Sequence, residues 1–545
     1  MNSTVKKIIN SKRFRCFVIS VLCFALLLLC CSPKFENECD GIMQTLLYGI
    51  NGHKHYNLVF SNVILGRFML ALTNILPGVP WYIVVHYILC FGSIYLISLI
   101  TLKKNDRKSV YVVITIMQLF LGYECYAAPN YIKTSSILIA SAIYYFIYYF
   151  ERDAKKVVPY VIFAFMSLAS SLFSYYAFSI VLIVSFVLVL IYCLINKLSK
   201  KNYIVLLVAF LLVFGIGTLL HCYDCTKYED ELRTHRPSME KLLSFGYPEY
   251  DENEALKLGI HEEKEFNNLK KVSYFNGNED EYSLVDGIAN MKNSVSINQF
   301  FKFMKTILIN LFSDGAFFLY IFLLFVLFMC SKHLKIVTIV TVIVMIVPLF
   351  VLYLLNSASY VWIYTMILMP ICCFTLANIN DMKLDNSRVL LAFSLLLTLM
   401  IYKNFENRIV SNYNYDSMTK QFDEKYENVI SLIDMSNYVR FFSPFKPYPQ
   451  SLANYDNVYY VNGIYTFFDD YDSVTQIGTW TPEQAKFYSD EEIDRLISEG
   501  KIIDDPYDDR KIIKSGNYVW IQNINGYSAE KMLQTNLEDF YNDEE

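Results

Sequence analysis

Eleven long hydrophobic stretches divide this chain, and the Lys and Arg residues between them concentrate on every second connection. A stretch of about 20 apolar residues is long enough to cross the hydrocarbon core of a bilayer as a helix. Because basic residues stay preferentially on the cytoplasmic side, their alternation predicts the side of the membrane on which each connection lies. We therefore expect an α-helical integral membrane protein of the cell membrane, multi-pass, with a cytoplasmic N-terminus and an external C-terminal part. The expected spans are residues 14–33, 80–102, 109–127, 134–150, 157–173, 175–195, 203–221, 314–331, 335–355, 359–378 and 387–402.

The composition agrees with a membrane protein, since 54% of the residues are hydrophobic and the mean hydropathy is +0.32. The formal net charge is −5, and acidic residues outnumber basic ones in both long segments expected outside the cell, 222–300 and 403–545. An acidic balance in the exposed parts argues against nucleic acid as a partner. The expected partners are the lipid bilayer and molecules at its outer surface.

The first external loop, residues 34–79, contains a further apolar stretch at 56–76. Counting this stretch as a span would place Lys103, Lys104 and Arg107 outside the cell and would invert every later connection. Polar residues also interrupt it at intervals that fit one side of a helix. We therefore predict that 56–76 is an interfacial helix lying along the membrane surface.

Two domains are expected. Residues 1–402 form the polytopic transmembrane domain, which carries the large external loop 222–300. Residues 403–545 form a small external α/β domain, in which turn-forming stretches separate short apolar runs. Strands are predicted at 457–461, 511–513 and 518–521, and helices near 424–435 and 490–499.

The acidic residues directly after the first span are the strongest candidates for chemistry. Glu38-Cys39-Asp40 follows the first apolar run by a few residues, so these carboxylates are held near the membrane surface, where they can meet a lipid-borne phosphate. Further along come the stretches Leu58-Val59-Phe60-Ser61-Asn62-Val63-Ile64-Leu65-Gly66 and Ile75-Leu76-Pro77-Gly78-Val79-Pro80-Trp81-Tyr82. The C-terminal part contains Ile477-Gly478-Thr479-Trp480 and Asn517-Tyr518-Val519-Trp520-Ile521.

With its acidic first loop, interfacial helix, about eleven spans and external C-terminal domain, the chain resembles the GT-C superfamily of membrane glycosyltransferases. Within that class it is most similar to uncharacterised bacterial multi-pass proteins whose first loop carries an Asn-Asp-Asp-like motif. Here Cys39 stands where the paired acid is expected, which leaves Glu38 as the nearest second carboxylate. The resemblance implies a polyprenyl-phosphate sugar as donor and a cell-surface glycan or similar molecule as acceptor.

Such a transfer needs a base to deprotonate the acceptor hydroxyl and cations to hold the leaving phosphate. Asp40 is the predicted base. Glu38 is predicted to share that role or to bind a divalent cation, which is the one cofactor that the sequence leaves open. Glu124, in the second external loop, lies where this superfamily offers another acid. The predicted phosphate-binding residues, all expected on the external side, are Arg67, Lys133, Arg233 and Arg236.

Two other functions remain open from the sequence. A polymerase or ligase of surface polysaccharide would also have about a dozen spans and a large external loop. A flippase or transporter of lipid-linked sugars would instead carry ionisable residues in the middle of its spans and repeated halves. Neither of these two features is evident, and no phosphate-binding loop of the Gly-x-x-x-x-Gly-Lys type occurs.

Overall fold

The structure is a computed structural model. It describes residues 11–31, 33, 35–36, 38–48, 54–58, 60–104, 108–153, 157–195, 200–227, 238, 242, 248, 250–261, 266, 279–291, 300–301, 304–305, 361–377, 430–434, 458–461, 502–504, 510–515 and 518–523.

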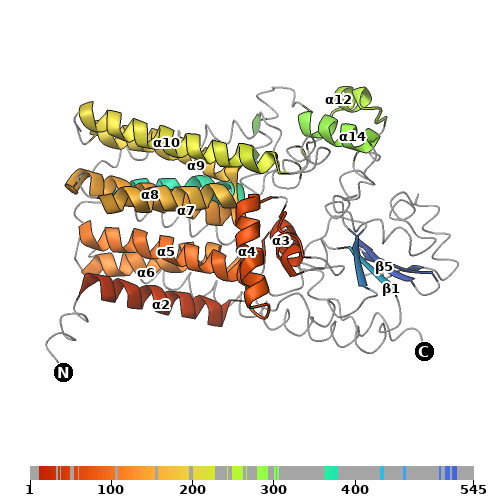
Figure 1. The fold of residues 1–545 in the computed structure, drawn as a ribbon, viewed down its shortest axis with the longest axis horizontal. Coiled ribbons are helices and arrows are strands. Elements are labelled where there is room, and N and C mark those ends of the chain that lie inside the picture. The colour runs from red at the N-terminus through yellow and green to blue at the C-terminus, as the bar shows by residue number, and fades with distance from the viewer. Residues whose placement is uncertain are drawn as a thin grey trace.

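Long apolar helices lie side by side and form an elongated bundle (Figure 1). Five helical segments in the described part are long and apolar enough to cross a membrane, as the first span and four others were predicted to be. They are Lys12–Cys30, Trp81–Lys104, Val110–Ala127, Tyr175–Ile195 and Tyr203–Cys225. The bundle helices are α2 (Lys12–Cys30), α5 (Trp81–Lys104), α6 (Lys108–Gly122), α7 (Tyr131–Asp153), α8 (Val157–Phe173), α9 (Tyr175–Ile195), α10 (Lys200–Cys225) and α18 (Val361–Ala377), and a π-helical turn, η2 (Tyr123–Ala127), follows α6.

Of the six remaining expected spans, the described residues include three. Residues 134–150 lie within α7, 157–173 coincide with the shorter helix α8, and 359–378 overlap α18. The spans expected at 314–331, 335–355 and 387–402 lie outside the described residues, so the total of eleven stays a prediction.

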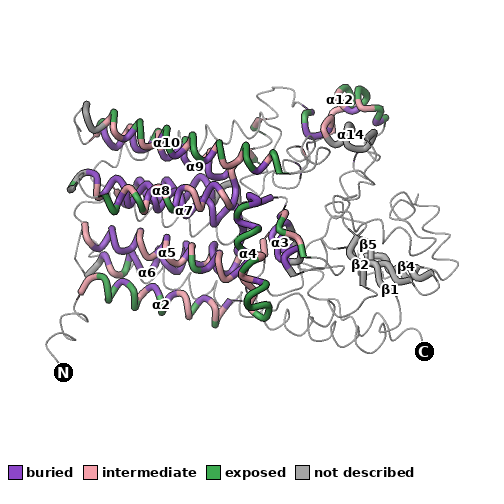
Figure 2. The backbone as a smooth tube through the Cα atoms, viewed as in Figure 1, coloured by how far each residue is buried: buried purple, intermediate pink, exposed green. Residues whose placement is uncertain are grey.

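Helix α7 occupies the centre of the bundle, where it contacts α5, α8, α9 and α18. Nearly all of its side chains are buried, whereas the outer helices α2 and α10 expose one side (Figure 2). Its small polar residues allow close approach to α8: the Ser170 hydroxyl donates to the Ser135 carbonyl at 2.8 Å, and the Ser135 hydroxyl donates to the Ser170 carbonyl at 2.9 Å. These hydroxyl groups explain why α7 is central without being among the most hydrophobic helices.

Helix α4 (Val63–Ile75) lies across the end of the bundle instead of along it (Figure 1). Its 13 residues extend roughly 20 Å, which is too short to cross about 30 Å of hydrocarbon. Its outer side exposes Ile64, Phe68 and Ile75, as a helix at a membrane surface would. The helix predicted at 56–76 is shorter than expected. Asn62 has an extended backbone conformation and caps the helix, so that the helix begins only at Val63.

Hydrogen bonds fix the start of α4 to the end of α10. The Asp224 carboxylate accepts a bond from the Val63 backbone N–H at 2.6 Å, and the Asn62 amide donates to the Leu220 carbonyl at 3.0 Å. Gly66 also permits a close approach, since a Cβ there would lie 1.8 Å from the Tyr56 carbonyl oxygen. These contacts hold α4 and the segment before it against the bundle.

Five strands of the C-terminal part form one mixed sheet in the order β2-β1-β5-β4-β3. Strand β1 pairs in parallel with β2 and β5, while β4 pairs antiparallel with β5 and β3. The strands are β1 (Ile430–Asp434), β2 (Val458–Val461), β3 (Ile502–Asp504), β4 (Arg510–Ser515) and β5 (Tyr518–Asn523).

The predicted strands at 457–461, 511–513 and 518–521 coincide with β2, β4 and β5. The helix predicted near 424–435 is wrong where β1 lies, because parallel pairing on both sides holds residues 430–434 in an extended conformation. The helix predicted near 490–499 lies outside the described residues. The described part of the loop 222–300 includes the helices α12 (Glu252–Lys257) and α14 (Glu279–Asn290), which share a small apolar core.

Reporter fusions provide a test of the orientation of the bundle. We expect fusions after Lys104, Lys156 and Lys201 to report a cytoplasmic position, because these sites follow or lie within basic connections. Fusions after Asn278 and Gly478 are expected to report an external position. An external signal after Lys104 would mean that residues 56–76 cross the membrane after all, in conflict with the crosswise position of α4.

Candidate active site

Asp40 lies in the first turn of α3 (Glu38–Tyr48), a short helix packed against α4 and α5. Its side chain is fully buried. The oxygen Oδ1 accepts two hydrogen bonds, from the Tyr82 hydroxyl at 2.8 Å and from the Tyr131 backbone N–H at 2.9 Å. The other oxygen, Oδ2, is buried and has no hydrogen-bond partner in the described part of the chain. One carboxylate oxygen is thus fixed, and the other retains its capacity to accept a proton.

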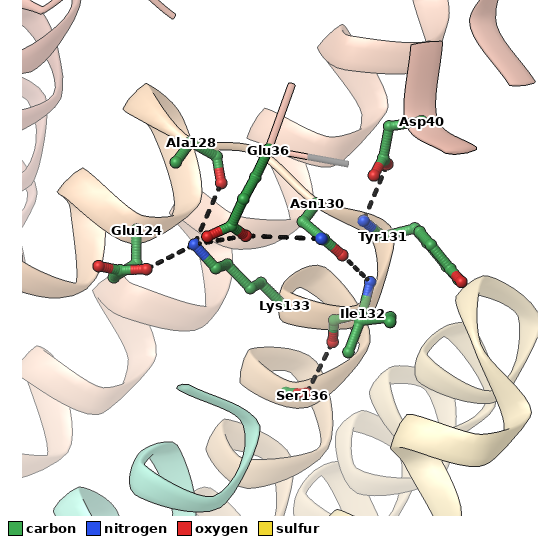
Figure 3. A network of polar contacts seen from close by, with 9 residues as sticks. All are labelled: Glu36, Asp40, Glu124, Ala128, Asn130, Tyr131, Ile132, Lys133 and Ser136. Carbon is green, nitrogen blue, oxygen red and sulfur yellow. Dashed lines mark hydrogen bonds and ion pairs between the residues drawn. The ribbon is translucent and has the colours of Figure 1, made fainter. Parts of the chain in front are cut away.

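The N-terminus of α7 supplies part of this arrangement (Figure 3). Asn130 caps the helix, since its side-chain oxygen accepts from the Ile132 N–H at 2.8 Å. The N–H of Tyr131, which lies between Asn130 and Ile132, donates to Asp40 instead. A carboxylate at a helix N-terminus also interacts favourably with the helix dipole.

Burial has the largest effect on the protonation of Asp40. It raises the pKa of the carboxyl well above its ordinary value, because a charged carboxylate loses its hydration there. The hydrogen bonds from Tyr82 and Tyr131 favour the ionised form and lower the pKa, but they oppose the effect of burial only in part. Asp40 is therefore a stronger base, when ionised, than a carboxylate in water.

A second cluster surrounds Lys133, in the first turn of α7. Its ammonium group lies 2.5 Å from Glu124 Oε2 and 2.8 Å from Glu36 Oε2, and it also donates to the Ala128 carbonyl at 3.4 Å (Figure 3). The Lys133 and Glu124 side chains are only 1% and 3% exposed. The π-helical turn η2 carries Glu124 into this position, and irregular helical turns of this kind are frequent at functional sites.

The two clusters belong to one region of the molecule. The Asn130 amide donates to Glu36 at 3.5 Å while its carbonyl oxygen caps α7, and the charges of Glu36 and Lys133 both act on the Asp40 carboxyl. Three carboxylates and one ammonium group therefore gather around the first turn of α7. Of their oxygens, Asp40 Oδ2 has no hydrogen-bond partner within the described residues and can accept a proton.

Three residues that the sequence predicted separately are brought together here: Asp40, Glu124 and Lys133. In this structure Lys133 pairs with protein carboxylates, so its predicted contact with a phosphate would require those pairs to open. Arg67 is exposed on α4, with its guanidinium carbon 5.0 Å from the centre of the Tyr56 ring. The Glu38 side chain, Arg233 and Arg236 lie outside the described residues.

Three further residues of the site, Glu36, Tyr82 and Asn130, were not predicted from the sequence. Glu36 precedes Glu38 by two residues and could have been included with the acidic residues after the first span. Tyr82 belongs to one of the stretches that carry the family resemblance, but nothing in its spacing pointed to Asp40. Within the described residues, no group of three or more His, Cys, Asp or Glu side chains is placed to hold a metal ion.

Comparison of this chain with protein-family models, with curated proteins and with solved structures gives no match.

Proposed function

We propose that this protein is a membrane glycosyltransferase that moves a sugar from a polyprenyl-phosphate donor to a cell-surface glycan. The observation that carries the proposal is the Asp40 carboxylate, held through Oδ1 by Tyr82 and Tyr131 while Oδ2 is left unpartnered in the described part of the chain. The site lies at the end of an apolar bundle, next to the crosswise helix α4, and this position supports the binding of a lipid-linked substrate at the membrane surface.

The proposed reaction follows from this geometry. Asp40 Oδ2 takes the proton of an acceptor hydroxyl, and the acceptor oxygen forms a bond to the anomeric carbon of the donor sugar. The bond from that carbon to the phosphate oxygen breaks, and the polyprenyl phosphate leaves with the electron pair. Because Asp40 is fully buried, admission of the acceptor requires the packing of α3 against α4 and α5 to open.

The leaving phosphate gains negative charge, which a nearby cation would stabilise. Arg67 is suited to this role because it is exposed on α4 near Ile64 and Phe68, two exposed apolar side chains that we expect to meet the bilayer surface. The proposed topology has eleven spans, with the α4 end of the bundle facing outward. The five-stranded sheet supports a small external α/β domain formed by residues 403–545.

A transfer assay in proteoliposomes tests this function. The full-length protein is supplied with a polyprenyl-phosphate hexose labelled in the sugar and with a surface glycan as acceptor. We expect the label to move from lipid to glycan, because the glycosidic bond to phosphate is broken. A label that stays on the lipid but reaches the opposite leaflet would identify a flippase. Transfer from a polyprenyl-linked oligosaccharide but not from the hexose donor would identify a polymerase or ligase.

The raised pKa of Asp40 predicts the pH dependence of transfer. Only the ionised carboxylate accepts a proton, so kcat/KM should fall as the pH is lowered through a value well above the usual pKa of about 4 for Asp. Stability changes in the opposite direction: because the pKa is raised in the folded protein, the stabilisation that protonated Asp40 contributes is lost as the pH rises through that value. Measuring both quantities over the same pH range tests these directions: kcat/KM should fall as the pH is lowered, and the melting temperature should fall as the pH is raised. A fall of kcat/KM centred on the ordinary pKa of Asp would contradict the assignment of Asp40 as the base.

A further inference from the structure

Three tyrosines of α7 pack against one another at the predicted cytoplasmic end of the bundle, away from α4 (Figure 1). The centre of the Tyr149 ring lies 4.7 Å from that of Tyr145 and 5.0 Å from that of Tyr148. Tyr131, which contacts Asp40, precedes Tyr149 by 18 residues, or roughly 27 Å along the helix axis. The three tyrosines therefore belong to a different region of the molecule from the candidate active site.

Lys103 and Arg152 lie over two of these rings. The Lys103 ammonium, in the last turn of α5, donates to the Tyr149 hydroxyl and lies 5.0 Å from the centre of its ring. The Arg152 guanidinium carbon, in the last turn of α7, lies 4.4 Å from the centre of the Tyr148 ring. Attraction between a cation and a ring face holds both groups in place. An ammonium has three N–H donors, and among the described residues Lys103 uses one of them, for Tyr149, so donors remain for a ligand.

A third cation comes from α2. Arg13, in the first turn of that helix, is exposed and lies close enough for its charge to act on the Tyr145 hydroxyl. Next to it α2 exposes Phe14 and Phe17, and the Phe17 ring lies 6.2 Å from the Tyr95 ring of α5. Exposed phenylalanines on an apolar span are expected to meet the acyl chains of the bilayer. Cations from three helices therefore border a surface that suits lipid.

The charge at this end of the bundle is strongly positive. We call Arg13, Lys103 and Arg152 the basic cluster, and among the described residues none of the three forms an ion pair with a carboxylate. The chain segments at this end contain ten Lys or Arg and three Asp or Glu residues, in 11–15, 103–108 and 151–156. Basic residues thus exceed acidic ones by seven, and such an excess attracts an anion.

We propose that the basic cluster binds the headgroup of an anionic phospholipid of the cytoplasmic leaflet. The phosphate oxygens accept hydrogen bonds from the cluster, and the acyl chains lie along Phe14 and Phe17 of α2. Basic groups between helices on the cytoplasmic side are typical of sites for anionic headgroups. A zwitterionic phospholipid also has a phosphate, but the cluster repels its additional cation. The site is independent of the proposed sugar transfer.

Native mass spectrometry of the full-length protein tests this site. Delipidated protein in detergent is titrated with phosphatidylglycerol or with phosphatidylcholine, and the dissociation constant of the tightest site is measured. We expect the wild type to bind phosphatidylglycerol more tightly. Arg13→Gln and Lys103→Gln should each weaken this binding by roughly fivefold, the effect of removing one basic group beside an anionic lipid. The double variant should lose most of the preference for phosphatidylglycerol.

Lys227→Gln is the matched control. The Lys227 ammonium also lies over a tyrosine ring, 5.3 Å from the centre of that of Tyr223, and its side chain is exposed. It follows α10, however, at the end of the bundle where α4 lies. This variant should bind phosphatidylglycerol as tightly as the wild type. Equal affinity of the wild type for both phospholipids, or unchanged phosphatidylglycerol binding when Arg13→Gln and Lys103→Gln are combined, would overturn the proposal.

A second experiment distinguishes a lipid from a soluble phosphate. Glycerol phosphate has the same phosphate chemistry without acyl chains, so at equal concentration it should not displace phosphatidylglycerol. Phe17→Ser removes an apolar contact for the acyl chains and should weaken phosphatidylglycerol binding. Phe165→Ser changes another exposed phenylalanine, on α8, and should leave binding unchanged. Displacement by glycerol phosphate, or equal effects of Phe17→Ser and Phe165→Ser, would contradict the binding of a lipid at this site.

Discussion

Replacing Asp40 with asparagine is expected to reduce sugar transfer by roughly two to four orders of magnitude, the range contributed by a general base. The Asn side-chain oxygen can still accept from the Tyr82 hydroxyl and the Tyr131 N–H, so the local geometry should be preserved. The amide nitrogen that replaces Oδ2 cannot take a proton. The rate should therefore fall while membrane insertion and the melting temperature change little.

The matched control is Asp251→Asn. The Asp251 carboxylate also accepts hydrogen bonds from backbone N–H groups at a helix N-terminus, those of Asn253 and Glu254 of α12, but it lies in the loop 222–300 and not at the proposed site. This variant should keep full activity in the proteoliposome assay. If Asp40→Asn transfers sugar within a factor of a few of the wild-type rate, Asp40 is not the base.

Replacing Lys133 with methionine is expected to lower the free energy of unfolding by about 3–5 kcal/mol, the range seen when one partner of a buried ion pair is removed. Methionine fills similar space but leaves the carboxylates of Glu124 and Glu36 without their cation. Two like charges would then share a region from which water is largely excluded. The melting temperature of the purified protein in detergent, together with chemical unfolding, measures the loss.

Lys257→Met is the control for Lys133→Met, because the Lys257 ammonium lies the same 2.5 Å from a carboxylate, that of Glu254. The Lys257 side chain is 67% exposed, so its ion pair is screened by water and its loss should have little effect on stability. Adding Glu124→Gln to Lys133→Met should recover part of the lost stability, since it removes one of the unpaired charges. A loss of stability in Lys133→Met as small as that in Lys257→Met would show that the buried ion pair is not important for stability.

The sequence predicted the helical membrane class well, because crossing a bilayer imposes a length and a hydropathy that a single stretch reveals. It could not predict where α4 begins, since the cap at Asn62 is completed by Asp224, which lies far along the chain. Strand β1 was mistaken for helix for a similar reason. A five-residue stretch with three apolar residues, Ile-Ser-Leu-Ile-Asp, suits either structure, and its partners Val458 and Tyr518 are remote in sequence.

The candidate site was predictable in part. Asp40 and Glu124 follow apolar runs whose ends place them near the membrane surface, and Lys133 is close in sequence to Glu124. Sequence spacing does not show which acids a lysine pairs with, so Glu36 was missed and Lys133 was assigned to a phosphate. The hydrogen bond from Tyr82 depends on the packing of α3 against α5, which no local pattern encodes.

The bond between Asp224 and the first turn of α4 also has a consequence for local unfolding. A helix of 13 residues with exposed apolar side chains would ordinarily fray from its start, and its first amides would exchange rapidly with solvent deuterium. Because the Val63 amide donates to a buried carboxylate on α10, it is released only when the two helix ends separate. The beginning of α4 and the last turn of α10 therefore form one cooperative unit, in which the exchange of Val63 reports the opening of α10.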